Sequence, residues 1–132
     1  MATKYPESFD VVSEKFESTG FESLNKKEQA IYTIWWLEAE VNNGGFHQYF
    51  WNSAGDNAEA ALNSLKIIGA TKTASLLKQA IDIAFDGRLP DSRSERQEQL
   101  EVDEESKEDK LAELDSVFYE NFYKMLDAYS VQ

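Results

Sequence analysis

The sequence predicts an all-α fold, organised as a single globular domain of about six or seven helices. Apolar residues recur at helical spacing along most of the chain, and no segment shows the sustained alternation that marks a strand. Glycines separate several of the periodic segments. With 132 residues, 42% of them hydrophobic, the chain is long enough to bury its own core, so we expect residues 1–132 to form one domain.

The first predicted helix follows Pro6, a residue that suits a first helical turn, and ends at Gly20. Its apolar side chains are Phe9, Val12 and Phe16. A second helix is predicted from a cap at Asn25 to about Asn42, with Glu28 in the capping-box position. Apolar residues cover most of its circumference: Ile31, Tyr32, Ile34, Trp36, Leu37, Ala39 and Val41. Such a helix is expected to be central and buried.

Gly44 and Gly45 permit a sharp turn with positive φ, after which a short helix is predicted over about residues 46–53. Gly55 stands beyond the end of that helix, and Asp56 is expected to cap the next one. The inward residues of this helix are Ala58, Ala61, Leu62, Leu65 and Ile68. A further helix starts at Thr71 or Thr73, with inward residues Ala74, Leu77, Ile81 and Ala84.

A loop is predicted over residues 86–91, and the chain beyond Ser92 is helix-forming but poor in apolar residues. Its two expected apolar anchors are Leu100 and Val102. The last helix recovers a clear period through Leu111, Leu114, Phe118, Phe122, Met125 and Tyr129.

One segment, residues 38–56, mixes large aromatic side chains with many groups that need hydrogen bonds. Its candidate structural or ligand-binding residues are Glu38, Asn42, Asn43, His47, Gln48 and Asn52. The favoured interpretation is that Glu38, Asn42, Asn43 and Asn52 fasten a helix junction through hydrogen bonds. The alternative is a polar pocket in which Glu38 or Glu40 acts as a general base, assisted by His47.

The same segment resembles a signature of the bacterial DNA mimic protein family, an acidic all-helical domain. There a helix ends in E-x-E-V-N-N-G-G-F and is followed by Q-Y-F and N-S-x-G-D. In this chain these motifs begin at Glu38, Gln48 and Asn52. The resemblance extends, more weakly, from about Asn25 to the C-terminus. It implies an all-helical fold and, as a function, mimicry of DNA, although most of the family is of unknown function.

The net charge of −12 argues against direct binding of nucleic acid or of anionic membranes, and favours partners with basic surfaces. The charge is uneven. Residues 1–94 hold 13 acids and 9 bases, a net −4, and residues 95–132 hold 12 acids and 4 bases, a net −8. An acid-rich segment, residues 95–115, holds ten acids and three bases, a net −7. Its candidate partner-binding residues are Glu98, Glu101, Asp103, Glu104, Glu105, Glu108 and Asp109.

If the acid-rich segment were one straight helix, its 21 residues would span roughly 31 Å, with one net charge per ~4.5 Å. B-DNA carries one charge per ~1.7 Å of its axis, so a single helix is too dilute to imitate a duplex. Two copies would approach ~2.2 Å per charge. We therefore expect a homodimer, with Trp36 and Trp51 as exposed aromatic candidates for its interface. The plain alternative is that the segment is a solvated helix or linker.

The absence of cysteine excludes disulfides and thiolate chemistry, and with one histidine we expect no metal and no cofactor. No apolar stretch is long enough to span a membrane and the N-terminus does not read as a signal peptide, so a cytoplasmic protein is expected. The favoured function is a protein-binding module, without catalytic residues, that occupies the basic site of a transcription regulator or other DNA-binding protein. The alternatives are a small-ligand-binding module or an enzyme that uses the polar residues between Glu38 and Asp56.

Overall fold

The computed structural model describes residues 8–130 of the chain, and it describes side chains from residue 9 to residue 120. In this part of the chain the predicted all-α class is confirmed, because it holds six α-helices, two short 3-10 helices and no strand. The α-helices are α1 (Ser8–Thr19), α2 (Lys26–Trp51), α3 (Ala58–Ile67), α4 (Thr71–Phe85), α5 (Arg93–Leu100) and α6 (Glu104–Ser130). The 3-10 helices are η1 (Phe21–Ser23) and η2 (Ser53–Asn57).

Local sequence accounts for where α1 ends and α2 begins. Gly20 follows α1 with φ 85°, and its N–H donates to the carbonyl of Phe16 at 2.8 Å. At the start of α2, the Asn25 side chain accepts from the Glu28 N–H at 2.8 Å, while the Glu28 carboxylate accepts from the Asn25 N–H at 2.9 Å. The capping box predicted from these two residues is therefore confirmed.

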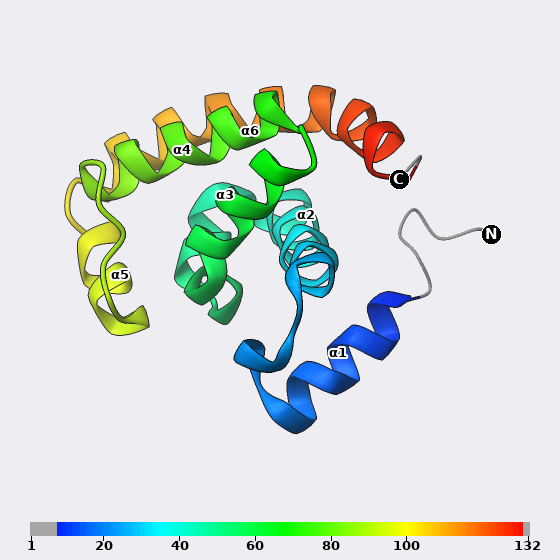
Figure 1. Cartoon of the computed structure of the whole chain (residues 1–132). Helices are drawn as coiled ribbons and strands as arrows, with labels where there is room; N and C mark the ends of the chain where they lie inside the picture. The colour runs from blue at the N-terminus through cyan, green and yellow to red at the C-terminus, as the bar shows by residue number, and fades with distance from the viewer. Residues whose placement is uncertain (1–7, 131–132) are drawn as a thin grey trace.

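The longest apolar helix, α2, lies at the centre of the molecule. Ile34, Leu37 and Val41 are fully buried in it. Figure 1 shows α3 beside α2, and α4 and α6 running side by side above them, an arrangement that the packing of these helices confirms. Their shared core also takes in Phe46, Tyr49 and Phe50 of α2 and the predicted inward residues of α3, α4 and α6, from Ala58 to Phe118.

A second, smaller core joins α1 to the first half of α2. Val12, Leu24, Ile31 and Tyr32 are buried in it, and Phe9 and Phe16 pack against it. The Phe16 ring stacks on the Tyr32 ring with centroids 4.4 Å apart. In Figure 1, α1 accordingly stands apart from α4, α5 and α6, and among the α-helices it packs mainly on α2. The helical stripe predicted for α1 is confirmed.

The turn predicted at Gly44–Gly45 exists, but it is a kink within α2. Gly45 has φ 84° and ψ −179°, which is not helical, and helical backbone resumes at once with Phe46. The two halves of α2 therefore meet without a loop. Gly44 itself shows no positive φ, so one glycine of the pair carries the whole change of direction.

Two predictions about single residues after the kink are wrong. Asp56 does not cap α3, because the cap residue is Asn57 and Asp56 pairs with arginines of α5. Val102 is not an anchor, since it is 60% exposed in the turn between α5 and α6. Gly55 stands beyond the end of α2, as predicted. It lies buried in η2, where a Cβ would stand 2.7 Å from the Tyr49 carbonyl oxygen.

The two tryptophans expected to be exposed are half-buried instead. Trp36 packs against the smaller core and Trp51 against the larger one. Four sequence predictions, on Pro6, Phe122, Met125 and Tyr129, fall outside the described side chains. Within the described residues, no helix combines the length and the apolar character that crossing a bilayer requires.

Candidate protein-interaction surface

Hydrogen bonds join the two halves of α2 across its kink, and most of them come from other groups than those the favoured interpretation named. The Glu40 carboxylate accepts from the Asn52 side chain at 2.9 Å and, more weakly, from the Gln48 side chain at 3.4 Å. These bonds join the two halves of α2 across the Gly45 break. Gln48 and Asn52 both donate to the Glu40 carboxylate and so contribute to this junction.

Glu38, Asn42 and Asn43 were expected to fasten the junction, but their side chains make no bond across it to any other described residue. The Glu38 carboxylate is half-buried and accepts from the Asn42 side chain one turn later on the same helix. Asn43 is exposed, and its side chain bonds to none of the described residues. Glu40 is therefore the carboxylate that bridges the kink, and replacing Asn43 is not expected to leave a buried group without a partner.

A second carboxylate reaches the kink from α6. The Asp115 side chain accepts from the backbone N–H of Phe46 at 2.9 Å, which satisfies an N–H left without a helical partner by the turn at Gly45. Burial raises the pKa of Asp115, and the bond from Phe46 opposes that rise only in part. Next to it, the Tyr119 hydroxyl donates to the Val41 carbonyl at 3.0 Å. Asp115 and Tyr119 thus complete the junction, although they lie 69 and 78 positions along the chain from their partners.

The raised pKa of Asp115 leads to a prediction about acid stability. Because its folded pKa exceeds the unfolded value, the folded state holds more protons between the two, so the contribution of Asp115 to stability declines as pH rises through that interval. Asp115→Asn cannot titrate. Urea unfolding at several pH values from about 4 to 7 should show wild type losing stability relative to Asp115→Asn as pH rises.

The matched control for this measurement is Asp109→Asn, an exposed carboxylate on the same helix. If wild type instead gained stability relative to Asp115→Asn as pH rises, the hydrogen bond from Phe46 would outweigh the effect of burial on the pKa of Asp115.

The end of α2 is fastened by an arginine that the sequence did not single out. Arg96 of α5 is only 3% exposed, and its guanidinium donates to the carbonyls of Phe50 at 2.8 Å and Asn52 at 3.0 Å. The same group pairs with Asp56 at 2.8 Å. Arg93 pairs with Asp56 from the outside at 2.6 Å. Hydrogen bonds from Arg93 and then Arg96 hold the pKa of Asp56 below its usual value. The sequence did hold a signal that Arg96 faces the core, since it precedes the apolar Leu100 by one helical turn.

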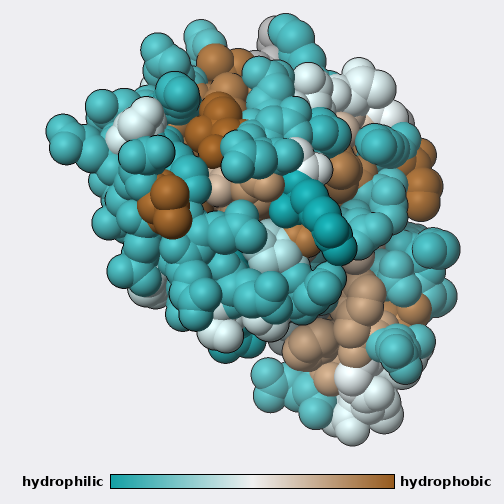
Figure 2. All heavy atoms as spheres, turned by 90° about the vertical axis from the view of Figure 1, so that its left-hand side faces the viewer, coloured by the Kyte–Doolittle hydropathy of each residue, from teal (hydrophilic) through white to brown (hydrophobic). Residues whose placement is uncertain are grey.

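The acid-rich segment is not one rod, because α5 ends at Leu100 and a turn over residues 101–103 leads into α6. Asp103 in this turn has φ 51°, in the left-handed region. Most of the predicted partner-binding acids are exposed: Glu98, Glu101, Asp103, Glu105, Glu108 and Asp109. Glu104 is half-buried, because it reaches back to His47 at 3.1 Å. Figure 2 shows the side of the molecule that carries α5, and hydrophilic residues cover most of it.

Four of the predicted acids line one shallow depression at the start of α6. Its lining consists of Asp103, Glu104, Glu105, Ser106, Asp109 and Lys110, four carboxylates against one ammonium group. The nearby Lys107 points elsewhere, because its ammonium group donates to the Gln99 carbonyl at 2.6 Å. The start of α6 is therefore a concave surface of concentrated negative charge.

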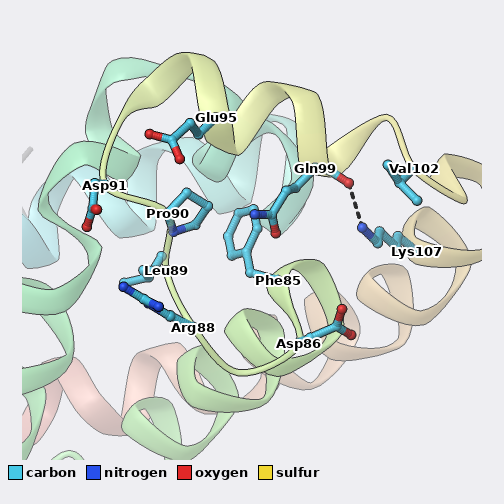
Figure 3. Close-up of a pocket in the computed structure, with 10 residues that line it drawn as sticks. All are labelled: Phe85, Asp86, Arg88, Leu89, Pro90, Asp91, Glu95, Gln99, Val102 and Lys107. Carbon is cyan, nitrogen blue, oxygen red and sulfur yellow. Dashed lines mark hydrogen bonds between the residues drawn. The ribbon is translucent and has the colours of Figure 1, made fainter.

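Another hollow lies between the end of α4, the loop after it and α5 (Figure 3). Phe85, Leu89 and Pro90 supply apolar surface, and three acids, Asp86, Asp91 and Glu95, are nearly balanced by Arg88 and Lys107. None of Glu38, His47 and Asn52 lines it. This hollow therefore gives no support to a ligand-binding or catalytic role for Glu38, His47 and Asn52.

Comparison with known proteins identifies the family of this chain. A family model described as DMP19-like protein matches residues 22–132, which covers most of the chain. Searches of the curated proteins and of the solved structures found no match. The resemblance that rested on the motifs around the α2 kink is thereby confirmed across nearly the whole described fold. The chain belongs to the DMP19-like protein family, the family of the DNA mimic protein DMP19.

Proposed function

We propose that this protein binds a basic DNA-binding protein through its acidic surface and competes with DNA for that partner. The observation that carries the proposal is the depression at the start of α6, which gathers Asp103, Glu104, Glu105 and Asp109 in one place. Family membership supports the same function. Carboxylates would stand in for phosphates, and the lysines and arginines of the partner would recognise them without any chemical reaction.

The charge density at the start of α6 is higher than the average over the acid-rich segment, and this favours a role in imitating DNA. Residues 103–109 hold five acids and Lys107, a net −4 over seven residues. At ~1.5 Å per residue they span roughly 10 Å, or one net charge per ~2.6 Å. The value for B-DNA is ~1.7 Å per charge. One protomer thus comes close to a duplex over a short distance, which suits the contact of a single basic helix or loop.

A longer imitation of DNA needs a second copy of the surface. We therefore propose a homodimer, with two-fold symmetry as the commonest arrangement for such an assembly. Trp36 and Trp51 are half-buried, so each leaves less surface for an interface than an exposed tryptophan would. Sedimentation at micromolar concentration measures the oligomeric state directly, and a species of only 15.1 kDa would limit the mimicry to the short surface of one protomer.

The proposal predicts that reversing charge on the acidic surface abolishes partner binding. Glu101, Glu105 and Asp109 are exposed, so changing all three to lysine should leave the fold intact. The bound partner should dissociate as salt rises through the physiological range, where the screening length is about 8 Å. The measurement is capture of proteins from a native lysate at low salt, followed by binding of the purified DNA-binding protein that is captured.

The matched control reverses three other exposed acids, Glu14, Glu17 and Glu22, which lie on or beside α1. It changes the net charge equally, so it separates a specific surface from a general effect of charge. DNA carrying the partner's site should displace wild-type protein from the partner. If the Glu101, Glu105 and Asp109 variant still binds, or if DNA and this protein bind the partner together, the proposed function is rejected.

A further inference from the structure

We propose that His47, Glu104 and Glu108 form a binding site for a divalent transition-metal ion, with Zn²⁺ as the best fit. The three side chains meet where α6 begins beside the second half of α2. The Nε2 atom of His47 lies 3.1 Å from a Glu104 carboxylate oxygen and 3.7 Å from a Glu108 carboxylate oxygen. One ligand atom from each residue lies within 4.8 Å of the others. This site shares Glu104 with the acidic depression, but it rests on none of the residues reversed above, so the two proposals can be tested separately.

The distances suit an ion placed between the three groups. Zn²⁺ binds imidazole nitrogen and carboxylate oxygen at about 2.0–2.2 Å, usually with tetrahedral geometry. Ligand atoms of such a tetrahedron stand roughly 3.3–3.5 Å apart. The distances from His47 to the two carboxylates, 3.1 and 3.7 Å, lie on either side of that value. Small rotations of exposed glutamate side chains would therefore complete the arrangement.

The local charge calls for a cation. Glu104 and Glu108 stand four residues apart on one helix, where like charges repel. Their only ion pairs among the described residues are with His47, which carries a charge only when protonated. Lys107, between them in sequence, donates to the Gln99 carbonyl instead. With a neutral imidazole the cluster has a net charge of −2, which a divalent ion would cancel.

The histidine distinguishes this cluster from ordinary surface acids. The His47 side chain is 22% exposed, and its ring stacks on Trp51 with centroids 6.0 Å apart and planes 13° apart. Its backbone follows the fixed kink at Gly45. A held imidazole thus presents one nitrogen to two carboxylates. The glutamates are 44% and 54% exposed, which leaves the remaining coordination position open to water.

The expectation that the chain binds no metal rested on its single histidine and the absence of cysteine. A count of ligand types does not show which side chains meet, whereas here His47 lies 57 residues before Glu104 and the two meet through the packing of α6 on α2. A bound ion would tie the start of α6 to the kinked half of α2. It would also neutralise Glu104 at the edge of the acidic depression.

The test uses the full chain, freed of metal with a chelator and dialysed, and titrated with Zn²⁺ in a calorimeter. We expect one ion per chain. Co²⁺ bound in the same place should give visible d–d absorption of a tetrahedral site, and Zn²⁺ should remove it. His47→Ala and Glu108→Gln should each weaken Zn²⁺ binding by at least about 100-fold, since loss of even an outer partner of a ligand costs 10–100-fold.

The control is Glu105→Gln, which removes the same charge from the same turn but lies outside the cluster, and its affinity should stay within about twofold of wild type. Circular dichroism of each variant checks that the helices persist. Glu108 is exposed, so its variant keeps the test valid even if His47→Ala unfolds. The proposal is overturned if no stoichiometric binding occurs up to millimolar Zn²⁺. The proposal is equally overturned if His47→Ala, Glu108→Gln and Glu105→Gln all bind Zn²⁺ with the same affinity, because binding would then be diffuse attraction to the acidic surface.

Discussion

Replacing Arg96 with alanine is expected to lower the free energy of unfolding by about 3–5 kcal/mol. The guanidinium is buried, and it donates to two carbonyls at the end of α2 while pairing with Asp56. Alanine would remove those charge-assisted bonds, leave the Phe50 carbonyl without this donor and open a cavity between α5 and α2. Urea unfolding followed by circular dichroism measures the change.

Arg93→Ala is the matched control, because Arg93 lies on the same helix and pairs with the same carboxylate but is half exposed. Exposed pairs contribute little, so this variant should lose much less stability than Arg96→Ala. Equal losses from the two arginines would show that pairing with Asp56, and not the buried bonds to the end of α2, gives Arg96 its importance.

The second large effect is expected from Gly45→Ala, which should cost about 3–5 kcal/mol. Two costs combine there. The backbone at φ 84° and ψ −179° is one that residues with a Cβ rarely adopt, and a Cβ would come within 2.2 Å of the Asp115 carboxylate. Asp115 would have to move, which would break its bond to the Phe46 N–H. Thermal and urea unfolding both report this loss.

Gly20→Ala separates the two costs. Gly20 has nearly the same backbone, φ 85° and ψ 168°, but a Cβ there would meet nothing within 4 Å. It should therefore lose only the strain, about 1–3 kcal/mol. In addition, Gly45→Ala combined with Asp115→Ala should lose less than the sum of the single variants, since the clash is removed. If Gly45→Ala costs no more than Gly20→Ala, the contact with Asp115 is not what requires glycine at the kink.

Features that depend on neighbouring residues were predictable from the sequence. The capping box of Asn25 and Glu28, the end of α1 at Gly20 and the turn at Gly45 each arise from bonds or backbone preferences within a few residues. The apolar stripes of α1–α4 were predictable for a related reason. Helical periodicity places such residues on one face, and any helix that joins a compact core must bury that face.

The acidic surface was predictable from the sequence only in part. Exposed carboxylates need no specific partner, so charge counted along the chain located Glu101, Glu105 and Asp109 on the surface correctly. It did not reveal that the segment bends between α5 and α6, or that Asp103, Glu104, Glu105 and Asp109 line one depression. A turn at residues 101–103 decides that, and its residues carry no strong turn signal.

The sequence by itself thus determined an acidic, all-helical member of the DMP19-like family, with its helices, their inward faces and a carboxylate-rich segment. Only the tertiary structure decided which polar groups meet. Arg96 reaches the end of α2, Asp115 reaches the Phe46 N–H, and Glu104 reaches His47, over separations of 46, 69 and 57 residues. Such partners are chosen by how helices pack, because the packing brings together side chains whose separation along the chain carries no periodic signal.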